Sequence, residues 1–285
     1  SGGLHGVGSS VVNALSESLV ATIRRDGAEW RQTYSQGKAT SKLKKLGPSR
    51  GTGTTIQFTP DAEIFGDFVF DADLIHEHLE VSSFLNSGLR IIFKDEVQGR
   101  RVELRHDGGV ADFLDAIVER VQAVPTTDKA FHLERENDPR LDMAMCWTDR
   151  PRETIKSFVN GIPTRDGGTH EQGLRDGIVK AVRNYIETHD VSLPRGLKLT
   201  SEDIREGIVV ICSVFVHDPQ FQGQTKDKLN NVELRAHVEG AVRADLEQWL
   251  NTHGTHADAI LHRIVMAAKA RTASRQASEQ VRRKS

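Results

Sequence analysis

Apolar residues near the start of the chain recur at helical spacing and then alternate as in extended strands. The apolar residues that lie four positions apart are Val7, Val11, Leu15 and Leu19. This spacing predicts a helix entered from a glycine-rich loop. The pattern is extended over residues 19–25 and 29–34, and the Asp26-Gly27 pair between them is a strong hairpin signal. A helix followed by a two-stranded hairpin is therefore expected.

A basic segment follows the hairpin. Residues 37–53 hold four lysines, one arginine and several residues that interrupt regular structure, and they predict a mobile loop. The next predicted elements are a strand, a helix and two further strands, over residues 54–59, 74–85, 89–94 and 101–106. Helices mixed with an antiparallel sheet indicate the α+β class.

The break at residues 107–109 predicts a boundary between two domains, residues 1–109 and 110–285. Beyond it, strict alternation over residues 141–147 predicts a half-buried strand, with residues 154–160 as its antiparallel neighbour. The apolar run at residues 207–216 predicts a strand in the centre of its sheet. Helical stripes are expected over residues 110–121, 174–186, 238–250 and 255–268.

Composition narrows the class of protein. The chain has 285 residues, enough for two domains with sizeable cores, and its 38 basic residues nearly balance 40 acidic ones. This balance excludes a globally basic nucleic-acid coat, so any contact with a polyanion is local. No run approaches the roughly 18 apolar residues of a membrane span, and two cysteines supply no disulfide framework. A soluble cytoplasmic protein without a membrane partner is expected, with Cys146 and Cys212 as buried small hydrophobes.

Two segments have the composition of a phosphate site. Residues 2–8 place four glycines in seven positions before a helix, where backbone N–H groups and the helix dipole favour an anion. Residues 218–229 follow the most apolar strand and offer Lys226 as a mobile cation beside the amide of Gln224. An ordinary helix entry and a solvated connection with two exposed lysines are the structural alternatives.

Six motifs in order carry a family resemblance. They are residues 1–8 with 11–16, Thr52-Gly53-Thr54, residues 84–88, residues 166–170, residues 218–221, and Gln224-Thr225-Lys226. Together they resemble the ATPase region of bacterial type IIA DNA topoisomerase B subunits, and the resemblance covers essentially the whole chain. The chain begins with serine inside the first motif, which suggests a fragment.

The resemblance implies a fold and a set of ligand contacts. Residues 1–109 would be the C-terminal part of a GHKL-type ATPase domain, an α/β sandwich, and residues 110–285 a transducer domain of the ribosomal-protein-S5 type with long C-terminal helices. Lys226 would contact the γ-phosphate of ATP, with Gln224 beside it, and Thr54 would lie on the floor of the adenine pocket. The phosphate-wrapping loop would comprise Gly3, Leu4, His5, Gly6, Val7 and Gly8.

The same resemblance implies partners for the complete protein and predicts which functional residues this chain lacks. The general-base glutamate, the asparagine that binds Mg²⁺ and the aspartate that recognises adenine match positions upstream of residue 1, so no metal ligand is expected in this chain. The 285 residues alone are expected neither to bind ATP well nor to hydrolyse it, whereas the complete protein would. The complete protein would self-associate as a dimer and act on a DNA duplex with a cleavage subunit of the gyrase A or topoisomerase IV A type.

Basic residues on one predicted helix are candidate DNA contacts. Arg175, Lys180 and Arg183 lie on its polar side, and the resemblance places this helix beside a cavity through which a duplex passes. The basic stretch from Lys269 is a second candidate. A solvated helix face is the structural alternative in both cases.

Two other functions remain open at this point. An ATP-operated clamp of a mismatch-repair or chaperone relative shares the expected fold, although Gln224-Thr225-Lys226 followed by Asp227-Lys228-Leu229 argues against it. An interaction domain whose glycine loop only starts a helix is the other. Within the topoisomerases, residues 193–199 with 249–251 resemble topoisomerase IV, whereas residues 205–207 and 84–88 resemble gyrase.

Overall fold

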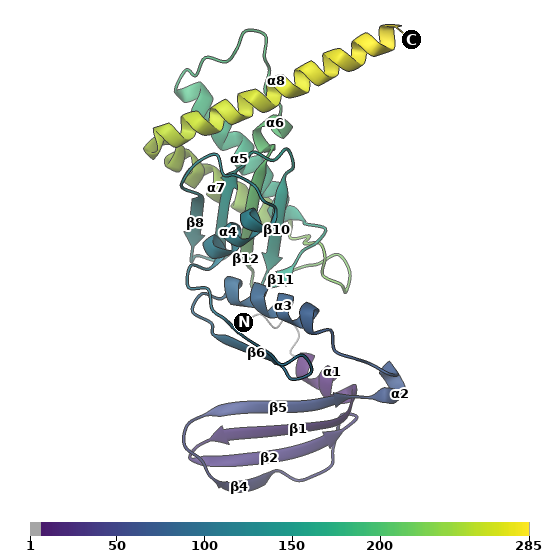
Figure 1. The fold of residues 1–285 in the computed structure, drawn as a ribbon. Helices are drawn as coiled ribbons and strands as arrows, with labels where there is room; N and C mark the ends of the chain where they lie inside the picture. The colour runs from purple at the N-terminus through teal and green to yellow at the C-terminus, as the bar shows by residue number, and fades with distance from the viewer. Residues whose placement is uncertain (1–6, 285) are drawn as a thin grey trace. The chain divides into compact units, whose positions relative to one another are not determined.

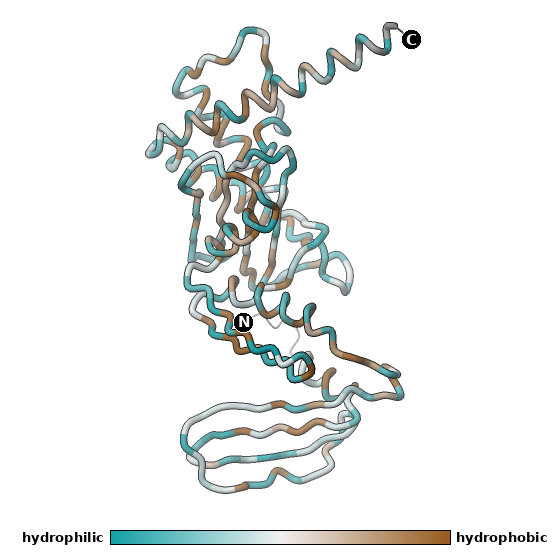
Figure 2. Tube along the Cα trace, in the orientation of Figure 1, coloured by the Kyte–Doolittle hydropathy of each residue, from teal (hydrophilic) through white to brown (hydrophobic). Residues whose placement is uncertain are grey.

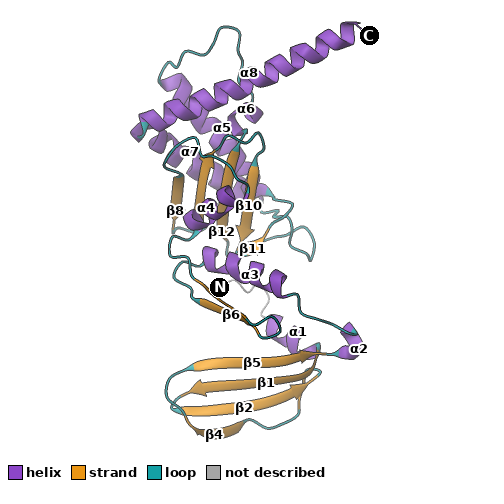
Figure 3. Cartoon of the chain, viewed as in Figure 1, coloured by secondary structure: helices purple, strands orange, loops and turns teal. Residues whose placement is uncertain are grey.

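The structure is a computed structural model that describes residues 7–284. The chain divides into two compact units, one ending at Ile75 and the other starting at His76. Figure 3 shows that both units combine helices with sheets, so the chain has the expected α+β class. The helix α3 (Ala72–Leu85) contains the division between the two units.

The first unit is built on an antiparallel sheet with the order β3-β2-β1-β5, in which β4 also pairs with β2 (Figure 1). The strands are β1 (Ser16–Arg25), β2 (Ala28–Ser35), β3 (Lys38–Ala39), β4 (Lys44–Pro48) and β5 (Gly53–Pro60). Two short helices, α1 (Gly8–Ala14) and α2 (Ala62–Phe65), flank the sheet in sequence. The predicted hairpin is confirmed, because Arg25 pairs with Ala28 across the Asp26-Gly27 turn.

The prediction of a mobile loop over residues 37–53 is wrong. This segment contains β3 and all of β4, and β4 pairs with β2 from Ala28 to Arg31. Backbone pairing to an existing strand satisfies its N–H and C=O groups, so a segment with weak strand propensity still forms a strand. Lys38, Lys44 and Lys45 of this segment therefore lie on strands of the sheet.

The second unit begins with a small layer between α3 and α4 (Val110–Arg120). The hairpin of β6 (Ile91–Asp95) and β7 (Arg100–Leu104) lies between these helices in sequence. Phe84 stacks on the rings of His106 and Phe113, with centroid distances of 3.6 and 4.7 Å. These aromatic contacts join α3, the segment after β7 and α4 into one cluster.

A five-stranded mixed sheet forms the centre of the second unit, with the order β11-β10-β12-β9-β8. Its strands are β8 (Phe131–Arg135), β9 (Arg140–Trp147), β10 (Thr154–Val159), β11 (Ile162–Pro163) and β12 (Ile208–Phe215). The central position predicted for the apolar run is confirmed by β12. The pairing predicted for residues 141–147 and 154–160 is wrong, because β12 lies between β9 and β10 and runs parallel to β10.

Helices cover both faces of this sheet. The longer ones are α5 (Thr169–Thr188), α7 (Val232–Thr252) and α8 (Gly254–Lys284), and a short α6 (Ser201–Arg205) precedes β12. Residues of α5, α7 and α8 share a core with one face of the sheet, and α4 packs on the other face. The apolar residues of these layers appear brown in Figure 2. Among the described residues, no helix is long and apolar enough to cross a membrane.

Both cysteines are buried in strands of this sheet, Cys146 in β9 and Cys212 in β12. Burial raises the pKa of each thiol to about 12. The expectation of two small hydrophobes in the core is confirmed.

Candidate functional site

Gln224 and Lys226 lie on a closed loop between β12 and α7. The loop narrows at its base, where the Asn230 N–H donates to the Gln220 carbonyl and the Gln222 N–H donates to the Lys228 carbonyl, both at 2.8 Å. These two hydrogen bonds pair residues 220–222 with residues 228–230, and Gln224 and Lys226 lie at the tip of the loop between the paired segments.

Two buried asparagines hold the ends of this loop. The Asn160 side chain exchanges two hydrogen bonds with the backbone of Val216, at 2.8 and 2.9 Å, just beyond the end of β12. Asn231 Oδ1 accepts from the Gln220 N–H at 2.7 Å, and its Nδ2 donates to the Asp218 carbonyl at 3.2 Å. Neither asparagine stands out in the sequence.

The loop base is also fixed by the turn at Gly167 and Gly168. The Leu229 N–H donates to the Gly167 carbonyl at 3.0 Å, and the Thr169 N–H donates to the Leu229 carbonyl at 3.1 Å. Gly168 has φ +140°, and a Cβ there would lie 2.3 Å from the Leu229 oxygen, so only glycine permits this approach. Two motifs about 60 residues apart in the sequence are thus joined backbone to backbone.

Lys226 is available for an anionic ligand. Its backbone has φ +60°, and its side chain is half-buried, whereas Gln224 is exposed. Among the described residues, no carboxylate pairs with Lys226. An unpaired ammonium on a braced loop has the chemistry to contact a phosphate.

A buried polar network lies behind the Gly167-Gly168 turn. The Ser157 hydroxyl donates to Glu171 Oε1 at 2.6 Å and contacts the Thr164 hydroxyl at 2.6 Å, which in turn lies 3.1 Å from His170 Nε2. Burial, with a smaller effect from the charge of Arg175, lowers the pKa of His170 to about 4. His170 is therefore neutral at neutral pH, and the carboxylate of Glu171 packs against Gly167.

The three candidate DNA-contacting side chains all make contacts inside the unit. Arg175 lies between two carboxylates, with N–O distances of 3.0 Å to Glu171 and 3.3 Å to Glu153. Lys180 pairs with Glu239 of α7, and Arg183 Nη2 donates to the Ser201 hydroxyl at 3.3 Å. DNA phosphates would have to compete with these partners for Arg175 and Lys180.

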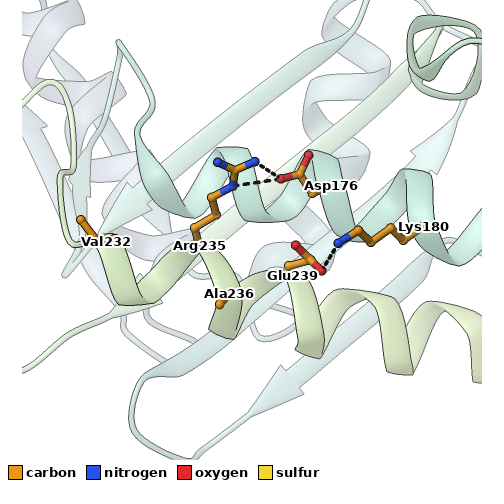
Figure 4. A pocket seen from close by; sticks show the side chains of 6 residues that line it. All are labelled: Asp176, Lys180, Val232, Arg235, Ala236 and Glu239. Atoms are coloured by element: carbon orange, nitrogen blue, oxygen red, sulfur yellow. Dashed lines mark hydrogen bonds and ion pairs between the residues drawn. The ribbon is translucent and has the colours of Figure 1, made fainter.

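Figure 4 shows the polar groove where α5 meets α7. Lys180 and Glu239 form one ion pair there, and Arg235 donates through two nitrogens to Asp176 Oδ2 at 3.0 and 2.7 Å. The two pairs cancel in charge, so this groove is neutral, and both side chains from α5 are already partnered by α7.

Thr54 and the glycine loop belong to the first unit. Thr54 of β5 lies opposite Ile23, which lies opposite Trp30, so these three residues share one face of the sheet. Leu19, Tyr34 and Phe58 form another row on that face. Thr54 is thus a hydroxyl on a largely apolar surface. Val7 and Gly8 lie at the start of α1, and the predicted contacts Gly3, Leu4, His5 and Gly6 lie outside the described residues.

An apolar pocket on the first unit was not foreseen from the sequence. It is lined by Val11, Val12, Leu15, Ser16, Phe58, Pro60, Phe65, Phe68 and Phe70. Phe70 packs edge-to-face with both Phe58 and Phe68, at centroid distances of 6.1 and 5.0 Å. Over the described part of the chain, no group of three or more His, Cys, Asp or Glu side chains is placed to hold a metal ion.

Comparison with known proteins gives a consistent family. The family profile described as DNA gyrase B matches residues 109–280. The DNA gyrase B subunit of Campylobacter jejuni is 40% identical over all of this chain and 36% of its own length, and that of Borreliella burgdorferi is 38% identical over 45% of its own length. The chain thus spans less than half the length of these relatives.

Solved structures agree in fold. The 43K ATPase domain of Thermus thermophilus gyrase B, in complex with an aminocoumarin, has a TM-score of 0.84 and 33% identity, over 96% of this chain and 75% of that one. The topoisomerase IV ATP-binding domain of Francisella tularensis has a TM-score of 0.78 and 33% identity, over 95% and 75%.

Proposed function

The chain belongs to the DNA gyrase B family, and from this premise we propose that it is the ATP-operated clamp module of a type II DNA topoisomerase B subunit. In this proposal the module couples the binding and hydrolysis of ATP to the passage of a DNA duplex. It acts within a longer, dimeric protein together with a cleavage subunit of the gyrase A type. The family profile and the curated relatives favour a gyrase subunit over a topoisomerase IV subunit.

The braced loop that presents Lys226 supports this function best. Its base is hydrogen-bonded to the Gly167-Gly168 turn and to the Asn231 side chain, so a displacement of Lys226 would be transmitted to the unit that contains β12 through these hydrogen bonds. A contact with the terminal phosphate would distinguish ATP from ADP. One charge-assisted hydrogen bond contributes about 1.5–3 kcal/mol, which biases a two-state movement by one to two orders of magnitude.

The remaining nucleotide contacts follow the family resemblance. The backbone of residues 3–8 would wrap the phosphates, and Thr54 would face the adenine ring from the apolar side of its sheet. Magnesium would neutralise the phosphate charge during hydrolysis, and the resemblance assigns its protein ligand to a position outside the described residues. Gln224 and Lys226 would supply electrostatic stabilisation from the second unit.

DNA contacts and domain limits are also proposed. Of the three candidates on α5, Arg183 is the most available, since its described hydrogen bond is to the hydroxyl of Ser201 and not to a carboxylate. The basic part of α8 from Lys269 is the second candidate. Residues 1–109 would be the ATPase part and 110–285 the transducer, and the family profile that starts at residue 109 supports this limit.

Steady-state ATPase measurement on the longer protein tests the role of Lys226. Lys226→Ala is expected to lower kcat by at least tenfold, because the terminal phosphate loses one charge-assisted contact. Lys228→Ala, two residues away on the same loop, removes an equal charge and is expected to change kcat less than twofold. Equal rates for wild type and Lys226→Ala would refute the role.

A further inference from the structure

Charge is separated along the first unit. Residues 16–60, which form its sheet, hold eight basic and three acidic residues, whereas residues 61–75 hold five acidic residues and no basic one. The unit is neutral as a whole, so the excess on the sheet does not arise from a basic composition. It is a local arrangement.

Most of this positive charge lies along the β2, β3 and β4 side of the sheet and is not neutralised. Arg24 and Arg25 pair with Glu29 and Asp26, at 3.3 and 3.7 Å. The other six cations are exposed and pair with no carboxylate among the described residues. We call them the basic edge: Arg31, Lys38, Lys42, Lys44, Lys45 and Arg50.

The strand register brings two of these cations face to face. Arg31 of β2 lies directly opposite Lys44 of β4, so the two side chains project from the same face of the sheet. Like charges at directly opposed positions destabilise a strand pair. Arg31 Nε has a weak hydrogen bond, 3.4 Å, to the Thr22 hydroxyl, which leaves most of the guanidinium free for another acceptor. A bound anion would remove this repulsion.

Protection of an exposed strand edge does not account for the whole arrangement. Lysines on an edge strand discourage pairing with other chains, and this explains Lys44 and Lys45 on β4. Arg31 lies on β2, which has neighbours on both sides, and Lys38 lies on β3. Lys45 Nζ lies 5.7 Å from the centre of the Trp30 ring, on the opposite face from Arg31. Cations thus extend over three strands and both faces.

We propose that the basic edge binds the phosphate backbone of duplex DNA without reading its sequence. Six exposed cations along a sheet rim match a regular polyanion. The choice of DNA as the polyanion rests on the proposed function. The charge arrangement of the basic edge is independent of that function. This surface is separate from the α5 and α8 candidates.

The test is fluorescence anisotropy of a labelled 40-base-pair duplex with the 285-residue chain, at several salt concentrations. The variant Lys38→Gln/Lys42→Gln/Lys44→Gln is expected to bind at least tenfold more weakly at low salt. Its slope of log affinity against log salt should fall by roughly 2.7, because each neutralised phosphate contributes about 0.9. The matched control Lys94→Gln/Lys129→Gln/Arg195→Gln loses the same charge at exposed sites of the second unit and should keep the wild-type slope.

A second variant keeps the test independent of folding. Lys44→Glu places a carboxylate opposite Arg31, so it should raise the melting temperature while weakening DNA binding more than Lys44→Gln does. Equal slopes for the triple variant and its control would overturn the proposal, as would an absence of binding by the wild-type chain at 50 mM salt. Tighter binding of polyglutamate than of DNA would reassign the surface to a protein partner. None of these outcomes bears on the ATPase comparison at Lys226.

Discussion

His170 illustrates how one buried side chain links stability to pH. Its ring is fully buried, Nε2 contacts the Thr164 hydroxyl, and Nδ1 has no hydrogen-bond partner. Burial lowers its pKa to about 4, below the value of 6.5 for an unfolded chain. The unfolded state therefore binds a proton more readily than the folded state between these values.

We expect this difference to destabilise the protein in mild acid. As the pH falls from 6.5 towards 4, the free energy of unfolding should decrease by up to about 1.4 kcal/mol per pH unit from this residue alone. Urea unfolding of wild type and His170→Gln at pH 7 and pH 5 measures the effect, since other titrating groups contribute equally to both. An identical loss of stability in the two proteins would contradict it.

At the residue scale, the sequence singled out Gln224 and Lys226 as candidates but not the residues that fix their loop. Gln224 and Lys226 stand out because amide and ammonium groups follow an apolar strand. Asn160 and Asn231, which fix the ends of their loop, carry no comparable signal, because each acts on backbone groups that only the folded chain brings near. The signal in the sequence for the buried network was Ser157, a polar residue next to the apolar Phe158 and Val159 of β10.

The contact between α5 and α7 depends on small residues at the element scale. Gly173 and Gly177 of α5 lie against the backbone of α7, where a Cβ would come within 2.3 Å of the Arg235 oxygen and 2.9 Å of the Glu239 oxygen. This approach also allows the two ion pairs of Figure 4 to form. Helix propensity and packing therefore make opposite demands on these positions.

We predict that packing prevails. Gly173→Ala should lower the free energy of unfolding by about 1–3 kcal/mol, although alanine favours a helix by about 1 kcal/mol over glycine. Gly240→Ala is the matched control in α7, because nothing lies within 4 Å of its Cβ position, and it should stabilise by about 0.5–1 kcal/mol. Chemical denaturation distinguishes the two signs, and stabilisation by both substitutions would show that α5 and α7 can separate without cost.

Hydrophobic periodicity predicted the strands of the second unit better than it predicted how these strands pair. The continuous apolar run of β12 indicated a strand buried on both faces, and its residues do alternate between the two core clusters. Local pattern holds no information on which strand enters between two others, so the neighbour predicted for β9 was wrong. Strand β4 was missed because its partner, and not its own composition, makes it a strand.

On the scale of the whole molecule, the order of motifs was the strongest signal. Six short motifs indicated the family that the profile and the relatives establish, and residues 166–169 of one of them bond to Asp227 and Leu229, just after the last motif. Composition could not have located the basic edge, since the opposing charges of residues 61–75 make the unit neutral. The sequence marks residues 37–53 as basic, but the pairing that brings Lys44 opposite Arg31 appears only after folding.

The proposed function predicts that the 285-residue chain alone shows no catalytic turnover of ATP. The positions that the resemblance assigns to the general base and to the magnesium ligand are not among its described residues. Phosphate release at saturating ATP should remain at background, and the longer protein should show turnover under the same conditions. If the 285-residue chain does turn over ATP, the predicted inactivity is contradicted. If Lys226→Ala then abolishes that turnover, the role of Lys226 is still supported.

The central position of β12 also affects how the chain is made. Its neighbours β9 and β10 precede it in sequence, and 68 residues separate the end of β9 at Trp147 from the end of β12 at Phe215. At about 5–20 residues per second, a ribosome needs roughly 3–14 s to add them. During this interval the nascent chain carries β9, and from Val159 onward β10 as well, while the strand that lies between them is not yet complete.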